Sequence, residues 1–398
     1  MTREGAASPA DAPYWLDGPY EPRPPLDRDL QVEACVIGGG AGGLSCALHL
    51  ARHGVEAVVL ERGVVAGGAS GRNGGFLIAG AAAFHVDARE RYGREHARRI
   101  YARTLAAQED VYRLARELGV EDVARRVGAL RVGISEEEAE HVRRHVEALR
   151  EDGFPAELVE RDRLPPALRR YAHNACLTEH DGTLHPARWI RALATAAERA
   201  GARIHEGTPV DAPIAAPGEG LVVAGPATVR ARHVIVAADA AVGALVPEYA
   251  GQVRPRRLHM VATAPVPERL TGQLVYSRWG HEYLQQRPDG RVLAGGFGDL
   301  DGERSYTEVE EGSPAIWGRI ERHLREDLDL DAELTHRWVG VVGYSDSGLP
   351  YVGEVPGRPG LYVAGGYSGT GNVAGFAAGR ELADLVAGRK HPARPSML

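Results

Sequence analysis

The pattern that decides the fold is the stretch EACVIGGGAGGLSCALHLARHGVEAVVLERG, which runs from Glu33 to Gly63. Its apolar run at 34–37 predicts a buried parallel strand, and Leu44, Ala47 and Leu48 mark one face of a helix. Gly54 stands where helix C-termini favour glycine, and 57–60 is a second apolar run. A strand, a glycine turn, a helix and a second strand within about 30 residues predict a βαβ unit.

The glycine turn inside this unit has the GxGxxG spacing that is typical of dinucleotide binding. The first glycine makes the tight turn, the second lets the backbone approach a pyrophosphate, and the third lets the helix pack closely on the sheet. Amides at the helix N-terminus then face the phosphates. Glu61, at the end of the second strand, is placed to bind ribose hydroxyls. The sequence therefore predicts an adenine dinucleotide bound by Gly38, Gly40, Ala41, Gly43, Glu61 and Arg62.

A second glycine-rich stretch, AGGASGRNGGFLIAG, follows the βαβ unit at residues 66–80. It has neither the period of a helix nor the alternation of a strand, so we expect a loop. Six glycines in these fifteen residues indicate a backbone that comes close to a ligand. An NAD site needs no further glycine-rich segment at this place. The alternative interpretation is a flexible surface loop.

Four segments together resemble the flavoprotein family that contains D-amino-acid oxidase, glycine oxidase and sarcosine oxidase. They are the N-terminal lead-in, GASGRNGG at 68–75, GTLHPARW at 182–189 and GYSGTGNVAG at 366–375. The resemblance extends from Tyr14 to Gly388 and is closest to the branch of γ-glutamylputrescine oxidase, whose members also carry GRNGG. It implies FAD as the dinucleotide.

The resemblance also implies where the flavin lies. The 68–75 loop would follow the pyrophosphate and ribityl chain and bring amides to the isoalloxazine edge near N5. The turn before the helix at 372–386 would face the N1–C2=O locus, where a helix N-terminus stabilises negative charge. Val210 matches the position where the family's strand meets adenine, or is a plain strand residue. The FAD contacts implied are Ser70, Gly71, Arg72, Asn73, Gly74, Gly75, Val210, Gly366, Tyr367, Ser368, Gly369, Thr370 and Gly371.

Covalent attachment of the flavin is not expected. Sarcosine oxidases use a cysteine in the segment that here reads VVGYSDSGLPYVG, at 341–353, and this segment has none. His85 is interpreted as a core or surface histidine. Asp239 stands where many relatives have glycine in a turn, and aspartate tolerates the left-handed backbone that such a turn requires.

The region at 251–331 has the pattern of antiparallel strands, which would form a roof over the flavin. Strict alternation places Trp279, His281 and Tyr283 on one face of a strand, with either face free to point inward. A histidine such as His281 titrates near neutrality and could accept the proton of an ammonium group. The candidates for substrate contact and catalysis are His281, Tyr283, Trp279, Arg72 and Tyr344, with Tyr276 and Arg256 near them.

The resemblance implies an FAD-dependent oxidase that acts on the C–N bond of a small amine or amino acid. The α-carbon would lose hydride to flavin N5, the imine would hydrolyse, and dioxygen would reoxidise the flavin with formation of H2O2. Sarcosine oxidases bind the substrate carboxylate through a lysine where this chain has Val373, and a histidine is common where it has Thr370. These departures favour an amine, or an amino acid held by other groups.

Three alternatives stay open. One is a dehydrogenase of the same fold that oxidises an amine or a 2-hydroxy acid and passes electrons to a quinone or a carrier protein. Another is a flavoprotein reduced by a pyridine nucleotide, which would normally need a second nucleotide fingerprint. The third is a non-catalytic flavin or nucleotide binder.

The predicted fold class is α/β plus α+β, a Rossmann-type FAD-binding domain built from discontinuous segments with an inserted antiparallel-sheet substrate domain. The FAD-binding segments would be 30–88, 165–250 and 332–392, and the substrate domain 89–164 and 251–331. Residues 1–29 would form an extended lead-in on the surface. Helices are expected over 88–118 and 136–151, the second started by the Ser135-x-x-Glu138 signal.

Bulk properties of the 398 residues limit the partners. A net charge of −7 with interspersed signs is unlike a nucleic-acid binder. The three cysteines have no CxxC spacing, which favours a reducing compartment. The N-terminus lacks the apolar core of a signal peptide, and no apolar run reaches the length of a membrane span. We expect a cytoplasmic enzyme with a small-molecule substrate and no metal site, and the oligomeric state stays open.

Overall fold

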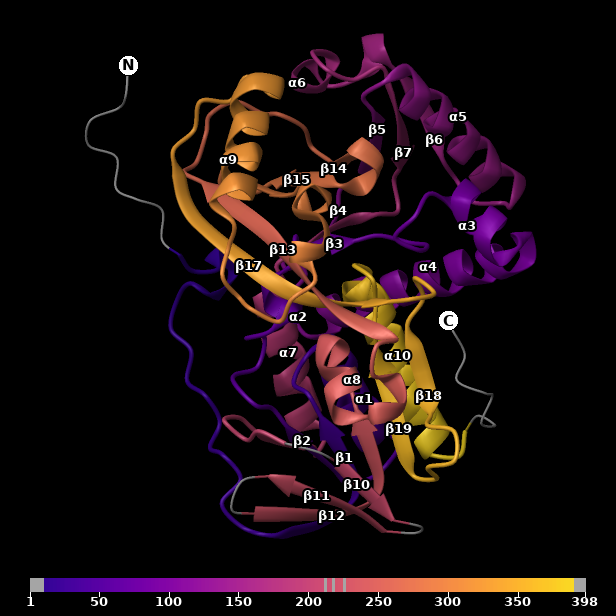
Figure 1. Ribbon diagram of the computed structural model, residues 1–398, viewed down its shortest axis with the longest axis vertical. Coiled ribbons are helices and arrows are strands. Elements are labelled where there is room, and N and C mark those ends of the chain that lie inside the picture. The colour runs from indigo at the N-terminus through magenta and orange to yellow at the C-terminus, as the bar shows by residue number, and fades with distance from the viewer. Residues whose placement is uncertain (1–10, 211–212, 217–218, 225–226, 390–398) are drawn as a thin grey trace.

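The computed structural model describes residues 11–210, 213–216, 219–224 and 227–389. These residues form two eight-stranded sheets and one three-stranded sheet. One large sheet lies in the lower half of Figure 1 and the other in the upper half, with the small sheet between them. Segments from both ends of the chain meet in the lower half, where α1 and α10 lie side by side.

The lower sheet is the α/β part of the molecule. Its strand order is β10-β11-β12-β1-β2-β9, and β19 pairs with β12 and β18. The ladders that join β9, β2, β1, β12 and β19 are parallel, as the buried apolar runs predict. The strands are β1 Leu30–Ile37, β2 Ala57–Leu60, β9 Arg203–His205, β10 Pro213–Ala216, β11 Glu219–Ala224, β12 Ala227–Val236, β18 Tyr351–Glu354 and β19 Leu361–Gly365.

Close helix packing covers this sheet. Helix α1 follows the glycine turn directly, and a Cβ at Gly43 would lie only 1.9 Å from the carbonyl oxygen of Gly38. A Cβ at Gly379 of α10 would lie 2.2 Å from the carbonyl oxygen of Gly42. Glycine is therefore required at both places for α1 to pack on the turn and on α10. The helices are α1 Ala41–Arg52, α2 Ala69–Arg72, α3 His85–Tyr92, α4 Arg94–Glu117, α5 Glu136–Glu151, α6 Pro166–Arg169, α7 Pro186–Arg199, α8 Val242–Leu245, α9 Pro314–Arg322 and α10 Gly371–Val386.

The upper sheet has the order β17-β13-β16-β15-β14-β5-β7-β6 and is antiparallel except between β14 and β5. Its outer face packs on α9 through a cluster that includes Val261, Leu284, Ile316 and Ile320. The expected antiparallel part is therefore present. The strands are β5 Ala129–Gly133, β6 Glu157–Glu160, β7 Asn174–Thr178, β13 Val253–Thr263, β14 Leu274–Ser277, β15 Glu282–Gln286, β16 Val292–Gly296 and β17 Leu334–Ser345.

The small sheet ties the second glycine-rich stretch to the GTL segment. Strand β3, Phe76–Leu77, pairs with β8, Gly182–Leu184, which in turn pairs with β4, Ala124–Arg126. The 66–80 stretch therefore contains a one-turn helix, α2, and a two-residue strand. The expectation of a loop without regular elements was wrong at these points.

One expected helix is divided. The residues from 88 to 118 form parts of α3 and α4, which are separated at Gly93, where φ is +82°. Helix α5 begins as predicted. The Ser135 hydroxyl accepts a hydrogen bond from the amide of Glu138 at 3.1 Å, and the Glu138 carboxylate accepts one from the amide of Ile134 at 3.1 Å.

The N-terminal lead-in is not confined to the surface. Trp15 has an exposed fraction of 1%, and its Nε1–H donates to the carbonyl of Asn73 at 2.7 Å. Leu26 is buried as well, and its amide donates to the Thr208 hydroxyl. The surface interpretation holds for most of residues 11–29 but is wrong for Trp15 and Leu26, which are apolar anchors packed against the lower half.

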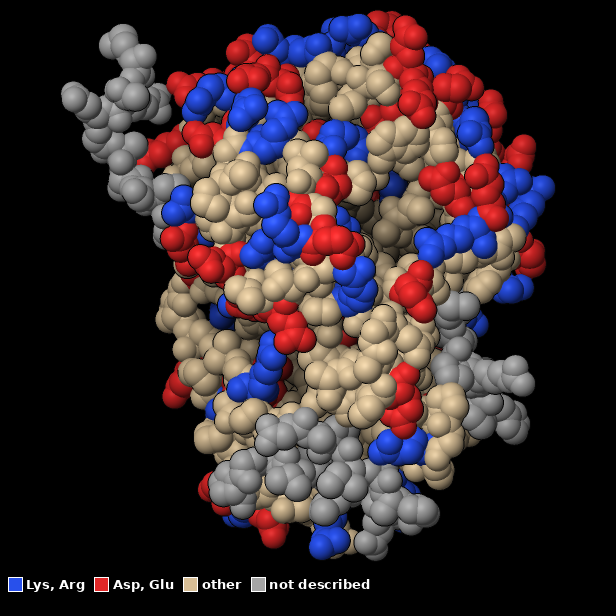
Figure 2. All heavy atoms as spheres, viewed as in Figure 1, with Lys and Arg blue, Asp and Glu red and all other residues tan. Residues whose placement is uncertain are grey.

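Two further features concern bulk properties. All three cysteines are buried with free thiols. Among the helices of the described ranges, none is both long enough and apolar enough to span a membrane. Figure 2 shows acidic and basic side chains interspersed over the visible face, with a hollow between the upper sheet and α3.

Candidate functional site

The first glycine turn has the geometry that the GxGxxG spacing predicts. Gly38 has φ +112°, and a Cβ there would lie 2.5 Å from the carbonyl oxygen of Ala237. The amide of Ala41, at the start of α1, donates to the Ser70 hydroxyl at 3.0 Å. The amides of Gly42 and Gly43 find no acceptor in the described part of the chain. The N-terminus of α1 therefore presents free donors, which suit a phosphate.

Glu61 lies beside this turn, as expected. Its carboxylate accepts hydrogen bonds from the amide of Gly39 at 2.7 Å and from the amide of Gly63 at 2.8 Å. Arg62 follows at the end of β2 and is exposed. Val210 lies in a loop after β9 and outside any strand, and it is half-buried. The interpretation of Val210 as a strand residue was therefore wrong.

The second glycine-rich stretch needs its glycines for packing against protein. A Cβ at Gly71 would lie 1.9 Å from the carbonyl oxygen of Ala66. Gly75 has φ +72°, and a Cβ there would lie 2.4 Å from the carbonyl oxygen of Leu184. At Gly74 the Cβ would meet the ring of Phe76 at 2.6 Å. At these glycines the close neighbour in the structure is the chain itself, and the expected approach to a ligand stays a prediction.

Asn73 joins the two glycine-rich turns. Its Oδ1 accepts from the amide of Gly75 at 2.8 Å and from Nδ2 of Asn372 at 3.0 Å. The same Nδ2 of Asn372 donates to the carbonyl of Phe76 at 2.9 Å. Asn372 is the second residue of α10, so the loop after β2 and the N-terminus of α10 are held together by side chains distant in sequence.

The turn before α10 is built on left-handed residues. Gly366, Ser368 and Gly369 have φ of +73°, +51° and +96°. The Asp239 carboxylate accepts from the amides of Gly366 at 3.0 Å and Tyr367 at 3.3 Å. Thr370 and Gly371 follow at the start of α10. The turn is therefore fixed by an aspartate that precedes it by more than a hundred residues in the chain.

Asp239 also reaches the upper sheet. Its Oδ2 accepts from the amide of Gly343 on β17 at 2.9 Å. Its φ of +44° confirms the left-handed turn expected for aspartate at this place. Burial raises the pKa of Asp239 above its usual value. This anchoring role was missed at the sequence level, although a charged residue after an apolar strand was a signal.

Tyr367 provides an unpaired polar group next to the α1 N-terminus. Its ring is buried, and its hydroxyl would lie 2.6 Å from a Cβ at Gly42. The hydroxyl has no hydrogen-bond partner in the described residues. A buried orphan hydroxyl beside free helix amides costs free energy unless a ligand supplies acceptors. These residues therefore fit the phosphates of FAD.

Arg72 ties α2 to the roof formed by the upper sheet. Its Nε donates to the carbonyl of Gly67 at 2.7 Å, and its Nη1 pairs with Glu310 at 2.6 Å. Its own carbonyl accepts from Nε1 of Trp338 at 2.8 Å. The Arg72 guanidinium is thus already neutralised by Glu310.

One face of the upper sheet points at the 73–76 segment. Gln285 donates from Nε2 to the carbonyls of Gly74 at 2.6 Å and Gly75 at 3.1 Å. Tyr283 lies two residues away on the same strand and therefore shares this face. The register pairs Tyr283 with Tyr276 of β14, which places both rings on the same side. We call this the roof face.

The roof tyrosines pack on the loop. The ring centroid of Phe76 lies 5.2 Å from that of Tyr276 and 5.7 Å from that of Tyr283. Tyr344 of β17 forms a bridge with Tyr367. Burial raises the pKa of Tyr276, Tyr283 and Tyr344 above the usual range, so their hydroxyls stay protonated.

Trp279 and His281 do not lie on the roof face. Residues 278–280 form a turn between β14 and β15, with Arg278, Trp279 and Gly280 at φ of +48°, +58° and +85°. Trp279 is 40% exposed, and the His281 side chain is 43% exposed and lies 3.9 Å from Asp299. The predicted alternation was wrong because the strand ends at Ser277 and a new strand begins at Glu282.

Two arginines share the side of the sheet that carries the tyrosines. Arg256 of β13 stacks on Tyr344, with its guanidinium carbon 5.0 Å from the ring centroid, and donates to the Ser305 hydroxyl at 3.2 Å. Arg131 of β5 is paired in register with Tyr276 and was not a sequence candidate. Neither arginine forms an ion pair with the carboxylates of the described ranges.

Comparisons with known proteins identify the family of the chain. The family described as "DAO: FAD dependent oxidoreductase" matches residues 33–385. A "Probable oxidoreductase OrdL" from Rhizobium meliloti is 30% identical over 401 residues, which are 98% of this chain and 91% of that protein. A "Gamma-glutamylputrescine oxidoreductase" from Escherichia coli is 28% identical over 381 residues, which are 93% of this chain and 87% of that protein.

The solved structures support the same conclusion for the fold. Glycine oxidase from Geobacillus kaustophilus superposes with a TM-score of 0.78 at 24% identity and covers 92% of this chain and 96% of that one. The α/β sheet and the antiparallel roof thus form the same fold as in that structure. The chain belongs to the DAO family of FAD-dependent oxidoreductases, as the resemblance of its four segments implied.

Proposed function

We propose that this protein oxidises the C–N bond of a small amine or amino acid where the roof face meets the 73–76 segment. The observation that carries the proposal is the convergence of two distant glycine-rich turns at the Asn73–Asn372 hydrogen bonds, directly below the roof tyrosines. We call the two glycine-rich turns, at 66–75 and 366–371, the floor. The floor would hold FAD and the roof face would hold the substrate.

FAD, when bound, supplies a hydride acceptor and passes the electrons on to dioxygen, with formation of H2O2. The amides of Gly42 and Gly43 and the Tyr367 hydroxyl would hold the phosphates, and Glu61 the ribose. The helix dipole of α10 would favour negative charge near the Gly366–Gly371 turn. All three cysteines are buried, which raises the pKa of their thiols, and none lies in the two turns. This supports FAD held without a covalent bond.

The chain's own contribution would be positioning and exclusion of water. The neutral amine would lose hydride from its α-carbon and a proton from nitrogen, and water would then convert the imine to a carbonyl compound and an amine or ammonia. The hydroxyls of Tyr276, Tyr283 and Tyr344 would bind the amine as neutral hydrogen-bond partners. His281, half-exposed at the end of the roof, stays a candidate to receive the proton.

The names of the relatives support the substrate class. One is an oxidoreductase of γ-glutamylputrescine and others are glycine oxidases, so amines and amino acids are both represented. Since Val373 is apolar, a short α-amino acid would need its carboxylate held by another residue. We therefore favour an amine, and we propose a cytoplasmic location for its oxidation.

The experiment is anaerobic reduction of the purified yellow protein by a panel of amines, N-methyl amino acids and D-amino acids, followed by mixing with air-saturated buffer. Bleaching by an amine, rapid return of colour and stoichiometric peroxide are the expected results. Bleaching with slow reoxidation in air, but fast reoxidation by a quinone, would favour a dehydrogenase. Absence of bleaching by every compound would refute the proposal.

A further inference from the structure

Two tryptophans bind successive carbonyl groups of the second glycine-rich stretch. Nε1–H of Trp338, on β17 of the roof, donates to the Arg72 carbonyl at 2.8 Å. Nε1–H of Trp15, in the N-terminal lead-in, donates to the Asn73 carbonyl at 2.7 Å. The exposed fractions are 3% for Trp338 and 1% for Trp15, so both hydrogen bonds lie away from bulk water, where they are stronger than at the surface. The roof and the lead-in thus bind neighbouring residues of the loop.

Gln285 binds the next two carbonyl groups. Its Nε2 donates to Gly74 at 2.6 Å and to Gly75 at 3.1 Å, so both N–H groups of the side-chain amide are used. The residue is 1% exposed, and its Oε1 has no partner among the described residues. An unpaired buried oxygen costs free energy, so packing alone does not explain an amide at this position. All four carbonyls of 72–75 are therefore bound by three side chains, which we call the carbonyl clamp: Trp15, Gln285 and Trp338.

The carbonyl clamp fixes the direction of one free amide. No peptide bond of the described residues is cis, and in a trans peptide the carbonyl of one residue and the N–H of the next point in opposite directions. Since Trp15 holds the Asn73 carbonyl, the Gly74 N–H is directed away from the indole. Within the described ranges, this N–H donates to no backbone or side-chain group. The following amide, that of Gly75, is already bound by the Asn73 side chain at 2.8 Å.

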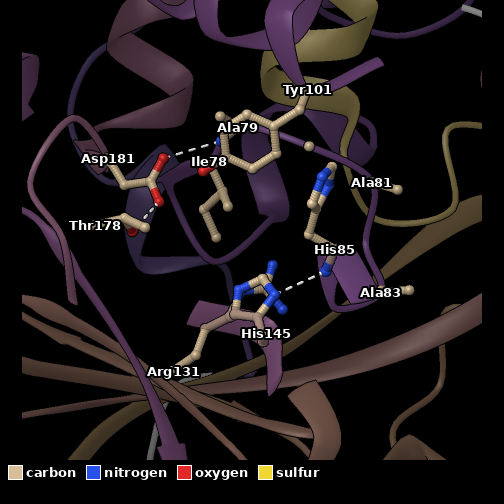
Figure 3. A pocket seen from close by; sticks show the side chains of 11 residues that line it. Ile78, Ala79, Ala81, Ala83, His85, Tyr101, Arg131, His145, Thr178 and Asp181 are labelled. Atoms are coloured by element: carbon tan, nitrogen blue, oxygen red, sulfur yellow. Dashed lines mark hydrogen bonds between the residues drawn. The ribbon is translucent and has the colours of Figure 1, made fainter. Parts of the chain in front are cut away.

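Further along, the same stretch is bound through its amides as well. The Ala79 amide donates to the Asp181 carboxylate at 2.9 Å, as Figure 3 shows. The Gly80 amide donates to the Thr104 hydroxyl at 2.7 Å. At 72–75, by contrast, no side chain of another element in the described part of the chain accepts from an amide. The carbonyl clamp thus binds acceptors and leaves a donor, which suits a ligand that accepts hydrogen bonds at this place.

We propose that Trp15, Gln285 and Trp338 are positioning residues for FAD, which direct the Gly74 amide toward an acceptor of the flavin ring near N5. The inference rests on the proposed function, which places the flavin at the 73–76 segment. A donor at that place withdraws electron density from the ring, while the bound carbonyls direct their negative ends toward the carbonyl clamp instead. Both effects favour the uptake of an electron pair by the ring. The N-terminal lead-in is therefore part of the cofactor site.

The test measures the flavin of the FAD-loaded protein rather than turnover. Sulfite adds to N5 of an oxidised flavin and bleaches its absorbance, so the dissociation constant of sulfite reports how readily the ring accepts an electron pair. The midpoint potential of the bound flavin, measured against a reference dye, is the second readout. FAD affinity, from quenching of flavin fluorescence, and thermal unfolding show whether a variant has lost its cofactor site or its fold.

The variants remove the donors one side chain at a time: Trp15→Phe, Trp338→Phe and Gln285→Met. The control is Trp189→Phe, because Trp189 is also buried but its Nε1–H has no acceptor among the described residues. We expect Trp15→Phe to raise the sulfite dissociation constant by about 3- to 10-fold and to lower the two-electron midpoint potential by about 15–30 mV. Gln285→Met should act in the same direction. Trp338→Phe should have a smaller effect, since its carbonyl lies one peptide before the free amide, and Trp189→Phe should behave as wild type.

Wild-type sulfite affinity and midpoint potential in Trp15→Phe, with FAD still bound, would overturn the inference while the proposed function stands. So would an effect of Trp189→Phe as large as that of Trp15→Phe, because loss of ring volume would then explain both. If Trp15→Phe does not fold, Gln285→Met is judged by the same criteria. The expected sulfite effects in a protein that no amine reduces would support the carbonyl clamp and refute the proposed substrate class instead.

Discussion

Replacing Asp239 tests how the floor and the roof are held together. The Asp239 carboxylate accepts three backbone amides: those of Gly366 and Tyr367 at Oδ1 and that of Gly343 at Oδ2. Asp239→Ala would strand all three donors and would place alanine at φ +44°, a left-handed conformation that costs about 1 kcal/mol. With about 1–2 kcal/mol for each stranded amide, we expect a loss of about 4–7 kcal/mol of unfolding free energy.

Two further substitutions separate the contributions. Asp239→Gly strands the same amides but tolerates the left-handed backbone, so its loss should be about 1 kcal/mol smaller than that of the alanine variant. Asp239→Asn keeps an acceptor for Gly366 and Tyr367, but its NH2 group faces the amide donor of Gly343. We expect it to lose about 2 kcal/mol and to weaken the link to β17 only.

The assay is urea unfolding of the apoprotein followed by tryptophan fluorescence, with FAD affinity measured by quenching of flavin fluorescence. The alanine variant should lose both stability and FAD affinity, and the asparagine variant chiefly stability. A loss below about 0.5 kcal/mol for Asp239→Ala would refute the argument, since it would mean that the amides find other acceptors. An asparagine variant as unstable as the alanine variant would refute the division between Oδ1 and Oδ2.

Two other predictions concern stability without the cofactor. Gly71→Ala places a Cβ 1.9 Å from the carbonyl oxygen of Ala66, so the unfolding free energy of the apoprotein, measured in urea, should fall by about 2–4 kcal/mol. Gly68→Ala is the control, because no atom lies within 4 Å of its Cβ, and its loss should stay under about 1 kcal/mol. Equal losses in the two variants would contradict the packing explanation. His259 is fully buried and its pKa is lowered to about 4 by burial, so the unfolded chain takes up a proton first as pH falls below about 6.5. The free energy of unfolding should therefore fall by about 3 kcal/mol between pH 6.5 and pH 4. In His259→Gln, the slope of the unfolding free energy against pH over this range, measured by urea unfolding, should correspond to about one proton fewer. An unchanged slope would argue against a neutral buried imidazole.

Local signals in the sequence predicted the floor because the chemistry there is local. The GxGxxG turn, the Ser135 cap and the two glycine-rich segments are each defined by a few adjacent residues. Gly38 is an example, since the φ of +112° at this one residue already requires glycine. The family could be recognised for the same reason.

The roof could be predicted only in outline because its residues meet through strand register. Arg131 stands beside Tyr276 through the parallel pairing of β5 with β14, which no local pattern specifies. The alternation expected for Trp279 and His281 failed because three successive left-handed residues end the strand, and only Gly280 among them favours that conformation. Trp15 was missed because one aromatic residue in a polar lead-in does not indicate its distant partner, Asn73.

The same contacts explain how this fold can accommodate different substrates while its cofactor site stays the same. The floor is fixed by Asn73, Asn372 and Asp239, whose hydrogen bonds go to backbone groups of the turns or to one another. The roof meets this floor through groups that include the Gly343 amide at Asp239, the Gln285 amide at Gly74 and Gly75, and the Trp338 indole at the Arg72 carbonyl. Side chains between those points on the roof face can change without altering the turns. An arginine on β5 is such a change, because it adds a charge at one end of the roof and leaves every floor contact in place.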